Sequence, residues 1–295
     1  MAISDKKVIL CCSGGGNRTV FHAGVYQALK DAGITIKHVF TVSGSSVTVP
    51  LSMVHQPKFM IRFVAATNVT KFIDYYETFE QIQENHALGA INPLFGKLIR
   101  TTFGVTTAKT LPDSTSIVAT DFNTGKPVYL TDAPIGTAVS ASMALPGLFK
   151  PVDYEGKPLV DGGVGEKIPV SQLSSMKEEK DIAVAVWFPE FSRRVIVQSM
   201  LSLAPKKMLA VKGVKYLLTA DPKTKKLLEQ FRTRQADLSK IDLNIQVKSL
   251  GFSFTKTNTS VLSQAYKLGY QTGQRVTHMV LYYDKLESDD KLMTV

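Results

Sequence analysis

The hydrophobic positions at the start of the chain follow two alternating patterns. Val8–Cys12 is a continuous apolar run, as in a strand that is buried on both faces of a parallel sheet. In Val20–Ala32 the apolar residues recur with helical spacing, and Gly33 follows where a helix commonly ends. Ile36–Val42 is a second strand-like run. This strand–helix–strand order predicts a three-layer α/β/α fold, in which helices cover both faces of a mostly parallel central sheet.

The same alternation continues along the chain without an internal repeat or a low-complexity linker, which indicates a single domain over residues 1–295. We expect the charged tail at 284–295 to fray. The predicted helices are 47–54, 59–90, 135–144, 206–219, 223–235 and 260–273, and the predicted strands are 116–120, 128–130, 159–160, 182–187 and 243–247.

Hydropathy and cysteine content bear on the compartment. No stretch reaches the roughly 18 uninterrupted apolar residues of a membrane span, and the first residues lack a signal-peptide core. The two cysteines, Cys11 and Cys12, are adjacent, so they suit neither a normal structural disulfide nor a metal site. We therefore expect a cytoplasmic protein that uses no metal and no other cofactor.

The basic residues are concentrated in one segment. Residues 191–240 hold twelve Lys and Arg against three Asp and Glu, so they carry nine of the ten net positive charges of the chain. Such a cluster favours a polyanionic partner, although a solvated surface has the same pattern. No nucleic-acid-binding motif accompanies it, so we expect peripheral binding to an anionic membrane rather than to nucleic acid. The candidate lipid-binding residues are Arg193, Arg194, Lys206, Lys207, Lys212 and Lys215.

A glycine-rich turn, Ser13–Arg18, joins the first strand to the first helix. Gly14, Gly15 and Gly16 would present successive backbone N–H groups at the helix N-terminus, where they could bind a phosphate or the oxyanion of an acyl-transfer reaction. Their spacing matches neither the phosphate loop of nucleotide hydrolases nor the dinucleotide-binding fingerprint. A tight turn without a ligand is the alternative.

The second strand runs into a serine-rich segment that is suited to a nucleophile elbow. Such an elbow needs small residues two positions before and two positions after the serine, because the chain crosses itself there. Ser46 has Gly44 before it and Thr48 after it. This frame fits better than the frames of Ser43 and Ser45, so we predict Ser46 as the nucleophile, with a threonine where glycine is preferred.

A serine hydroxyl needs a base to become a good nucleophile. None of the five histidines lies in a recognisable triad context. Asp161 is the better candidate, because it follows a strand end and precedes Gly162 and Gly163, which allow a sharp turn that would leave its carboxylate facing a cleft. An Asx-turn at Asp161 is the alternative.

Taken in order, these segments resemble the patatin-like phospholipase family. The family's loop of three glycines, any residue and arginine corresponds to Gly14–Arg18, its G-x-S-x-G elbow to Gly44–Thr48, and its Asp-Gly-Gly motif to Asp161–Gly163. Residues 117–125 and 141–152 look like the strand and helix that the family has between these motifs. The resemblance covers about residues 6–190.

The resemblance implies a lipid acyl hydrolase with a serine–aspartate dyad and no histidine. Ser46 would attack an ester carbonyl of a membrane phospholipid, and Asp161 would take its proton. The amides of the three loop glycines would hold the oxyanion, and Arg18 would brace the loop. Water would then release the fatty acid from the acyl-enzyme.

Two positions depart from the family pattern, since Thr19 and Thr48 stand where the family has glycine. These departures motivate a second hypothesis, a catalytically inactive lipid-binding or scaffold protein. A phosphate- or nucleotide-binding module, which rests on the glycine turn alone, is the third.

Overall fold

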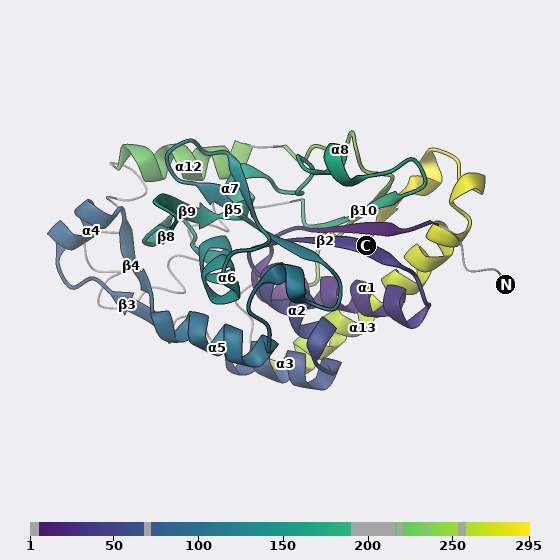
Figure 1. Cartoon of the computed structure of the whole chain (residues 1–295), viewed down its shortest axis with the longest axis horizontal. Coiled ribbons are helices and arrows are strands. Elements are labelled where there is room, and N and C mark those ends of the chain that lie inside the picture. The colour runs from purple at the N-terminus through teal and green to yellow at the C-terminus, as the bar shows by residue number, and fades with distance from the viewer. Residues whose placement is uncertain (1–5, 68–71, 190–215, 217–220, 234, 253–257) are drawn as a thin grey trace.

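A computed structural model shows a central sheet with helices on both faces, which confirms the predicted three-layer α/β/α fold (Figure 1). The structure describes residues 6–67, 72–189, 216, 221–233, 235–252 and 258–295.

The central sheet has nine strands in the order β12-β11-β10-β1-β2-β5-β9-β8, with β6 paired to β5 outside this path. The strands from β12 to β5 run parallel, whereas β9, β8 and β6 form antiparallel pairs. The strands are β1 (Val8–Cys12), β2 (Ile36–Val42), β5 (Thr115–Asp121), β6 (Pro127–Leu130), β8 (Val152–Tyr154), β9 (Lys157–Asp161), β10 (Ile182–Trp187), β11 (Leu243–Gln246) and β12 (Leu292–Thr294).

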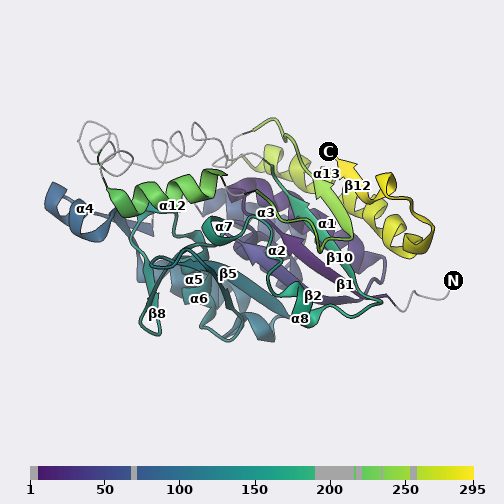
Figure 2. The same ribbon diagram turned by 90° about the horizontal axis from the view of Figure 1, so that it is seen from above.

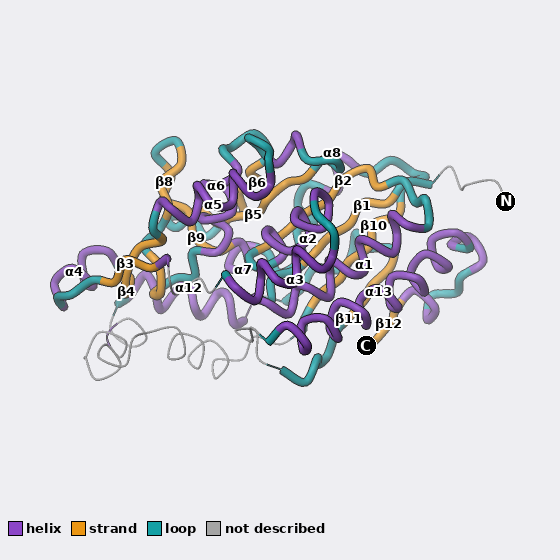
Figure 3. Tube along the Cα trace, turned by 90° about the horizontal axis from the view of Figure 1, so that it is seen from below, coloured by secondary structure: helices purple, strands orange, loops and turns teal. Residues whose placement is uncertain are grey.

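Longer helices cover one face of this sheet, and a thinner layer covers the other (Figures 1 and 2). The view from below shows α1, α2, α3 and α13 lying across the first face (Figure 3). The first face has α1 (Val20–Asp31), α2 (Ser45–Val54), α3 (Pro57–Ala66), α5 (Pro93–Phe103), α6 (Ile135–Met143) and α13 (Thr259–Leu281), and the second has α7 (Gly162–Gly165), α8 (Leu173–Met176) and α12 (Pro222–Thr233). Short 3-10 helices lie at Gly16–Thr19, Ala108–Thr110, Tyr283–Lys285 and Asp289–Lys291.

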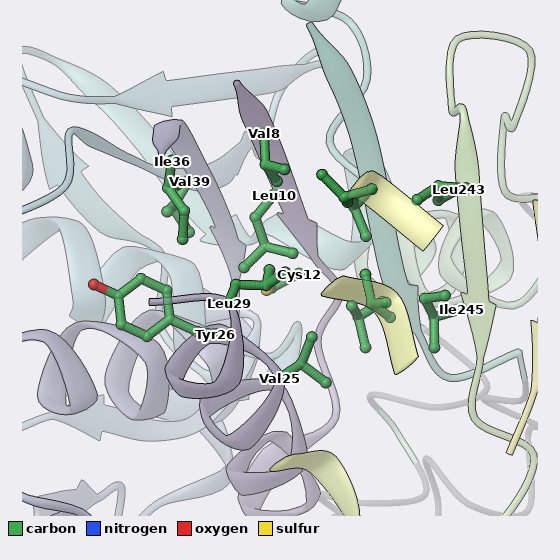
Figure 4. Packing of buried hydrophobic residues seen from close by; sticks show 14 of the residues in the cluster. Val8, Leu10, Cys12, Val25, Tyr26, Leu29, Ile36, Val39, Leu243 and Ile245 are labelled. Carbon is green, nitrogen blue, oxygen red and sulfur yellow. The ribbon is translucent and has the colours of Figure 1, made fainter. Parts of the chain in front are cut away.

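Strand β1 is fully buried, as its continuous apolar run predicts. Leu10 and Cys12 pack against Val25 and Leu29 of α1 (Figure 4), while Cys11 faces the opposite layer. Both cysteines are buried free thiols. A strand with helices on both sides has no polar face, which explains why the sequence identifies it so clearly.

Residues 59–90 do not form the single helical region that their aromatic residues suggested. They contain part of α3, then β3 (Ile73–Tyr75), α4 (Phe79–Asn85) and most of β4 (Ala87–Ile91). Strands β3 and β4 join β7 (Gly147–Phe149) in a small second sheet. A capping box between Thr78 and Gln81 starts α4, and His86, with a φ of 52°, ends it. These local signals override the apolar spacing.

The C-terminal tail pairs with the sheet, so the prediction that it frays is wrong. Strand β12 runs parallel to β11, and the amide of Val295 donates to the carbonyl of Gln246 at 2.9 Å. Met293 is buried in the core. The charged residues before β12 dominate the sequence pattern of the tail, so the pattern did not predict a strand at its short apolar end.

Helix α13 is longer than predicted, because Gly269 and Gly273 make a helix contact rather than a helix end. A Cβ built on Gly269 would lie 2.1 Å from the carbonyl oxygen of Phe21, and one on Gly24 would lie 2.3 Å from that of Tyr266. The missing side chains therefore let the backbones of α1 and α13 touch. No helix in the described part of the chain combines the length and apolar character needed to cross a bilayer.

Much of the basic segment 191–240 lies outside the described residues. This includes all six candidate lipid-binding residues, Arg193, Arg194, Lys206, Lys207, Lys212 and Lys215. The described part of the segment contains α12, close to the predicted helix at 223–235.

Candidate active site

The glycine turn, the serine elbow and the Asp161 turn meet where three strands end. In the parallel pair of β2 and β5, Val42 lies opposite Val118. Strand β9 approaches β5 from the other direction and ends with Asp161 opposite Ala119. Because Val118 and Ala119 are neighbours, these two registers bring the end of β9 beside the end of β2, where the elbow begins.

The glycine turn packs directly on the elbow. A Cβ built on Gly14 would lie 3.1 Å from the Cβ of Ser43, and one on Gly44 would lie 2.4 Å from the carbonyl oxygen of Gly16. Within the described part of the chain, the amides of Gly14, Gly15 and Gly16 have no hydrogen-bond acceptor. They are therefore available to an anion beside Ser43.

The elbow has Ser43 at its apex, and the prediction that placed Ser46 there is wrong. Ser43 has a φ of 53°, in the left-handed region that non-glycine residues rarely adopt, and it is partly exposed. It stands between the last residue of β2 and the N-cap residue Gly44 of α2. Ser46 lies in the first turn of α2 and is fully buried.

The three serines of this segment differ in where their hydroxyls bond. The Ser46 hydroxyl donates to the carbonyl of Ser43 at 2.5 Å. The Ser45 hydroxyl contacts the amide and carbonyl of Val42 and the carbonyl of Cys12. Both are bound to the backbone and brace the turn. The Ser43 side chain instead interacts with the Asp161 carboxyl, whose pKa it lowers.

Asp161 is buried at the end of β9, where its carboxylate caps the short helix α7 and accepts the amide of Gly163 at 2.9 Å. Burial raises the pKa of Asp161 to about 6, against the opposing effect of the hydrogen bonds from Ser43 and Gly163. The carboxyl group therefore titrates close to neutral pH, which suits a group that must both accept and return a proton. Asp161 thus makes both the Asx-type bond to Gly163 and a contact with a serine, which the sequence offered as alternatives.

Helix α6 and strand β5 hold these two turns in place. The amide of Ser43 donates to the hydroxyl of Ser142 at 2.8 Å, and that hydroxyl donates to the carbonyl of Val118. The hydroxyl of Thr120 donates to the carbonyl of Asp161 at 2.9 Å. Ser142 and Thr120 therefore position the elbow and the carboxylate on one framework. Sequence reasoning missed both roles, because the contacts join distant segments.

The two threonines that replace family glycines contact each other. The Thr48 hydroxyl donates to the carbonyl of Thr19 at 3.0 Å and lies 3.1 Å from its hydroxyl, which in turn donates to the carbonyl of Gly16 at 2.6 Å. Both residues are buried. The pair links the helix that follows the elbow to the glycine turn, so neither hydroxyl is an unsatisfied polar group in the core.

Arg18 lies against the glycine turn. Its Nε donates to the carbonyl of Gly15 at 3.4 Å, and its guanidinium lies 4.6 Å from the centre of the Phe188 ring. His22 stacks on the same ring, with its ring centre 5.0 Å from that of Phe188. Burial, together with the charge of Arg18, lowers the pKa of His22 to about 3, so this histidine is neutral at physiological pH.

The described residues contain no group of three or more His, Cys, Asp or Glu side chains that could hold a metal ion. The amides of the glycine turn, Ser43 and Asp161 are the reactive groups that the three turns bring together. Such a set can polarise an ester carbonyl, attack it and transfer a proton.

Comparisons with known proteins identify the family of the chain. The family model for patatin-like phospholipase matches residues 10–174, which include the glycine turn, the elbow and Asp161. The chain is 28% identical over 191 residues to an uncharacterised NTE family protein of Mycobacterium tuberculosis, a match that covers 62% of this chain and 50% of that protein. It is 26% identical over 184 residues to lysophospholipase nte1 of Neurospora crassa, covering 62% of this chain and 12% of that protein.

Among solved structures, the crystal structure of VipD from Legionella pneumophila has a similar fold. The TM-score is 0.52 at 14% sequence identity, and the match covers 99% of this chain and 72% of VipD. This chain spans half or less of the length of the two sequence relatives above. Since the family match extends over more than half of the chain and includes all three motifs, the chain belongs to the patatin-like phospholipase family of lipid acyl hydrolases.

Proposed function

We propose that the chain hydrolyses fatty-acyl esters of membrane phospholipids, with Ser43 as the nucleophile and Asp161 as the base. The observation that carries this proposal is that Ser43, the one partly exposed serine of the elbow and the residue at its apex, interacts with the buried carboxyl of Asp161. The proposal replaces the predicted Ser46 with Ser43 and keeps Asp161.

In the first half of the reaction, Asp161 takes the proton of Ser43 while Oγ attacks the ester carbonyl carbon. The amides of Gly14, Gly15 and Gly16 bind the developing oxyanion, because the glycine turn packs on Ser43 and these amides have no acceptor among the residues that the structure describes. The tetrahedral intermediate then expels the alcohol part of the lipid, which takes the proton from Asp161. The fatty acyl group stays on Ser43 as an ester.

In the second half, Asp161 takes a proton from water, and the resulting hydroxide attacks the acyl-enzyme. The same amides bind the second oxyanion. Collapse of this intermediate breaks the bond to Ser43, which regains its proton from Asp161, and the fatty acid leaves. The reaction uses no histidine, and the lowered pKa of the buried His22 keeps that side chain neutral.

The experiment compares fatty-acid release from phospholipid vesicles by three variants. Ser43→Ala and Asp161→Asn should each reduce kcat by about 10³-fold or more, since each removes a reacting group. Ser46→Ala is the matched control, because it removes a hydroxyl of the same elbow that bonds only to the backbone. We expect it to keep activity within about tenfold of the wild type.

Two results would contradict the proposal. If Ser46→Ala abolished release while Ser43→Ala did not, the assignment of the nucleophile would be wrong. If the wild-type chain released no fatty acid from any phospholipid class, the inactive lipid-binding alternative would replace the enzymatic one.

A further inference from the structure

Helix α12 presents basic side chains beside the turn that holds Asp161. Its outer face exposes four of them, and the neighbouring turn of the chain exposes a fifth. We call this set the basic ridge. It consists of Lys126, Lys223, Lys225, Lys226 and Arg232.

The inner face of α12 packs on the Asp161 turn itself. A Cβ built on Gly163 would lie 2.6 Å from the ring of Phe231, so this glycine allows the phenyl ring to reach the turn. The amide nitrogen of Gln230 donates to the carbonyls of Gly125 and Val164, at 2.8 and 3.2 Å. The helix that carries most of the basic ridge therefore packs on the same backbone turn that positions the Asp161 carboxylate.

The start of α12 is fixed by a second set of contacts. Asp221 is fully buried and accepts the amide of Thr224 at 2.8 Å, as a helix N-cap does. Nδ1 of His86 lies 2.7 Å from the Asp221 carboxylate, and the hydroxyl of Thr224 donates to the carbonyl of His86. These bonds join α12 to the end of α4, so the helix is held at both ends.

The charge of the ridge is largely uncompensated. Lys225 and Lys226 have no ion-pair partner in the described part of the chain, and the nearest bond of Lys223 is to the neutral side chain of Asn123, at 3.3 Å. The acidic residue on the exposed face, Glu229, bonds to Arg232 of the same helix. The exposed ammonium groups of Lys225 and Lys226, with Lys223 beside them on one helix, match a surface of densely spaced anions.

We propose that the basic ridge binds the anionic headgroups of a lipid bilayer and so brings the bilayer surface next to the Asp161 turn. The choice of lipid as the partner rests on the proposed function, whereas the binding itself needs no catalysis. Apart from Pro222 at its start, the residues that α12 exposes are polar, so the contact is electrostatic and does not require insertion into the hydrocarbon. It should therefore weaken as salt screens the charges.

The test measures co-sedimentation of the full chain with vesicles of phosphatidylcholine alone, or with an added fraction of phosphatidylglycerol. The ridge variant carries Lys225→Glu and Lys226→Glu. The control variant carries Lys58→Glu and Lys97→Glu, which change the net charge equally at exposed positions of α3 and α5, on the opposite side of the sheet (Figure 1). Hydrolysis of a water-soluble short-chain ester reports on the catalytic groups in both.

We expect the wild type to prefer the anionic vesicles and to lose this preference between low salt and about 0.5 M salt, where the screening length falls well below 10 Å. The ridge variant should bind the anionic vesicles at least about tenfold more weakly than the control variant. Hydrolysis of the soluble ester should not differ between the two.

The proposal is overturned if the ridge and control variants bind vesicles equally, because the effect would then depend only on net charge. It is also overturned if the ridge variant keeps vesicle binding but loses binding to duplex DNA, which would make nucleic acid the partner. Failure of the proposed function is a separate result, because Ser43→Ala would then leave hydrolysis unchanged while vesicle binding could still follow the ridge.

Discussion

The ionised carboxylate of Asp161 should destabilise the fold that carries it. Burial raises the pKa of Asp161 from 3.8 to about 6, even with the hydrogen bonds from Ser43 and Gly163 opposing the change. The folded chain therefore binds the proton more tightly than the unfolded chain does. Between these two pKa values the folded state holds more protons, so raising the pH lowers the free energy of unfolding.

The magnitude follows from the size of the shift. The rise of about 2 in the pKa of Asp161 corresponds to a loss of about 3 kcal/mol in the free energy of unfolding. This loss is fully present above pH 6 and absent well below pH 4. Asp161→Asn keeps the shape of the side chain and an oxygen that can accept the amide of Gly163, but carries no charge. This variant should be inactive and, at pH 8, more stable than the wild type by up to about 3 kcal/mol.

The assay is urea denaturation of the wild type and Asp161→Asn over a range from pH 8 to pH 4. Other titrating groups are the same in both proteins, so the difference in the free energy of unfolding isolates Asp161. We expect the difference to be largest at pH 8 and to shrink steadily below pH 6. Equal stability at pH 8, or a difference that does not change with pH, would refute the reasoning.

Three further predictions concern activity and packing. Ester hydrolysis by the wild type should rise with pH up to about 6 and then level off, since Asp161 acts as a base only when ionised, and a pH–rate profile of kcat measures this. Thr48→Val should lower the free energy of unfolding by about 1–2 kcal/mol and reduce kcat more than it raises KM, whereas Thr48→Ser should restore both, because the hydroxyl bonds Thr19 beside the glycine turn. Gly269→Ala should destabilise by about 1–3 kcal/mol in the same denaturation assay, while the exposed Gln274→Ala should change little, because only the first introduces a Cβ against the backbone of α1.

The parts of the fold that the sequence predicts well are those with the simplest surroundings. Strands β1 and β10 are buried along their whole length and consist of apolar residues, and β2 departs from this pattern mainly at Lys37 and His38, so the three runs stand out. The turn after β1 and the turn after β9 carry glycines at positions where a Cβ would meet another segment. These constraints act on single residues and are visible in the sequence.

Other parts depend on contacts between distant segments. Gly269 and Gly273 look like helix ends but lie inside α13, because α1 approaches them. The final strand, β12, exists because β11 offers an open edge for pairing. In both cases the local sequence pattern is compatible with more than one secondary structure. Contacts with a segment far away in the chain determine which of these structures forms.

The bounds of β2 and α2 identify the serine at the apex of the elbow better than the flanking residues do. The requirement for small flanking residues favours Ser46, because Gly44 stands two positions before it. This requirement does not consider where the preceding strand ends. Strand β2 ends at Val42 and α2 begins at Ser45, so two residues remain for the turn. A sharp strand-to-helix turn must place its apex there, and Ser43 is the one of the two with a side chain that can react.

Placing the apex of the elbow at Ser43 also changes the role of Thr19 and Thr48. With Ser43 at the apex, the positions two before and two after it are Thr41 and Ser45, so Thr48 no longer fills a position of the elbow motif. Thr48 instead bonds to Thr19 and, through it, to the glycine turn. The feature that first argued for an inactive protein is therefore a connection between the helix that follows Ser43 and the glycine turn. The departures that remain, Thr41 and Ser45, are small buried residues, and the hydroxyl of Ser45 ties the elbow to Cys12 of β1. A serine can replace the motif glycine here because its hydroxyl finds backbone partners inside the turn.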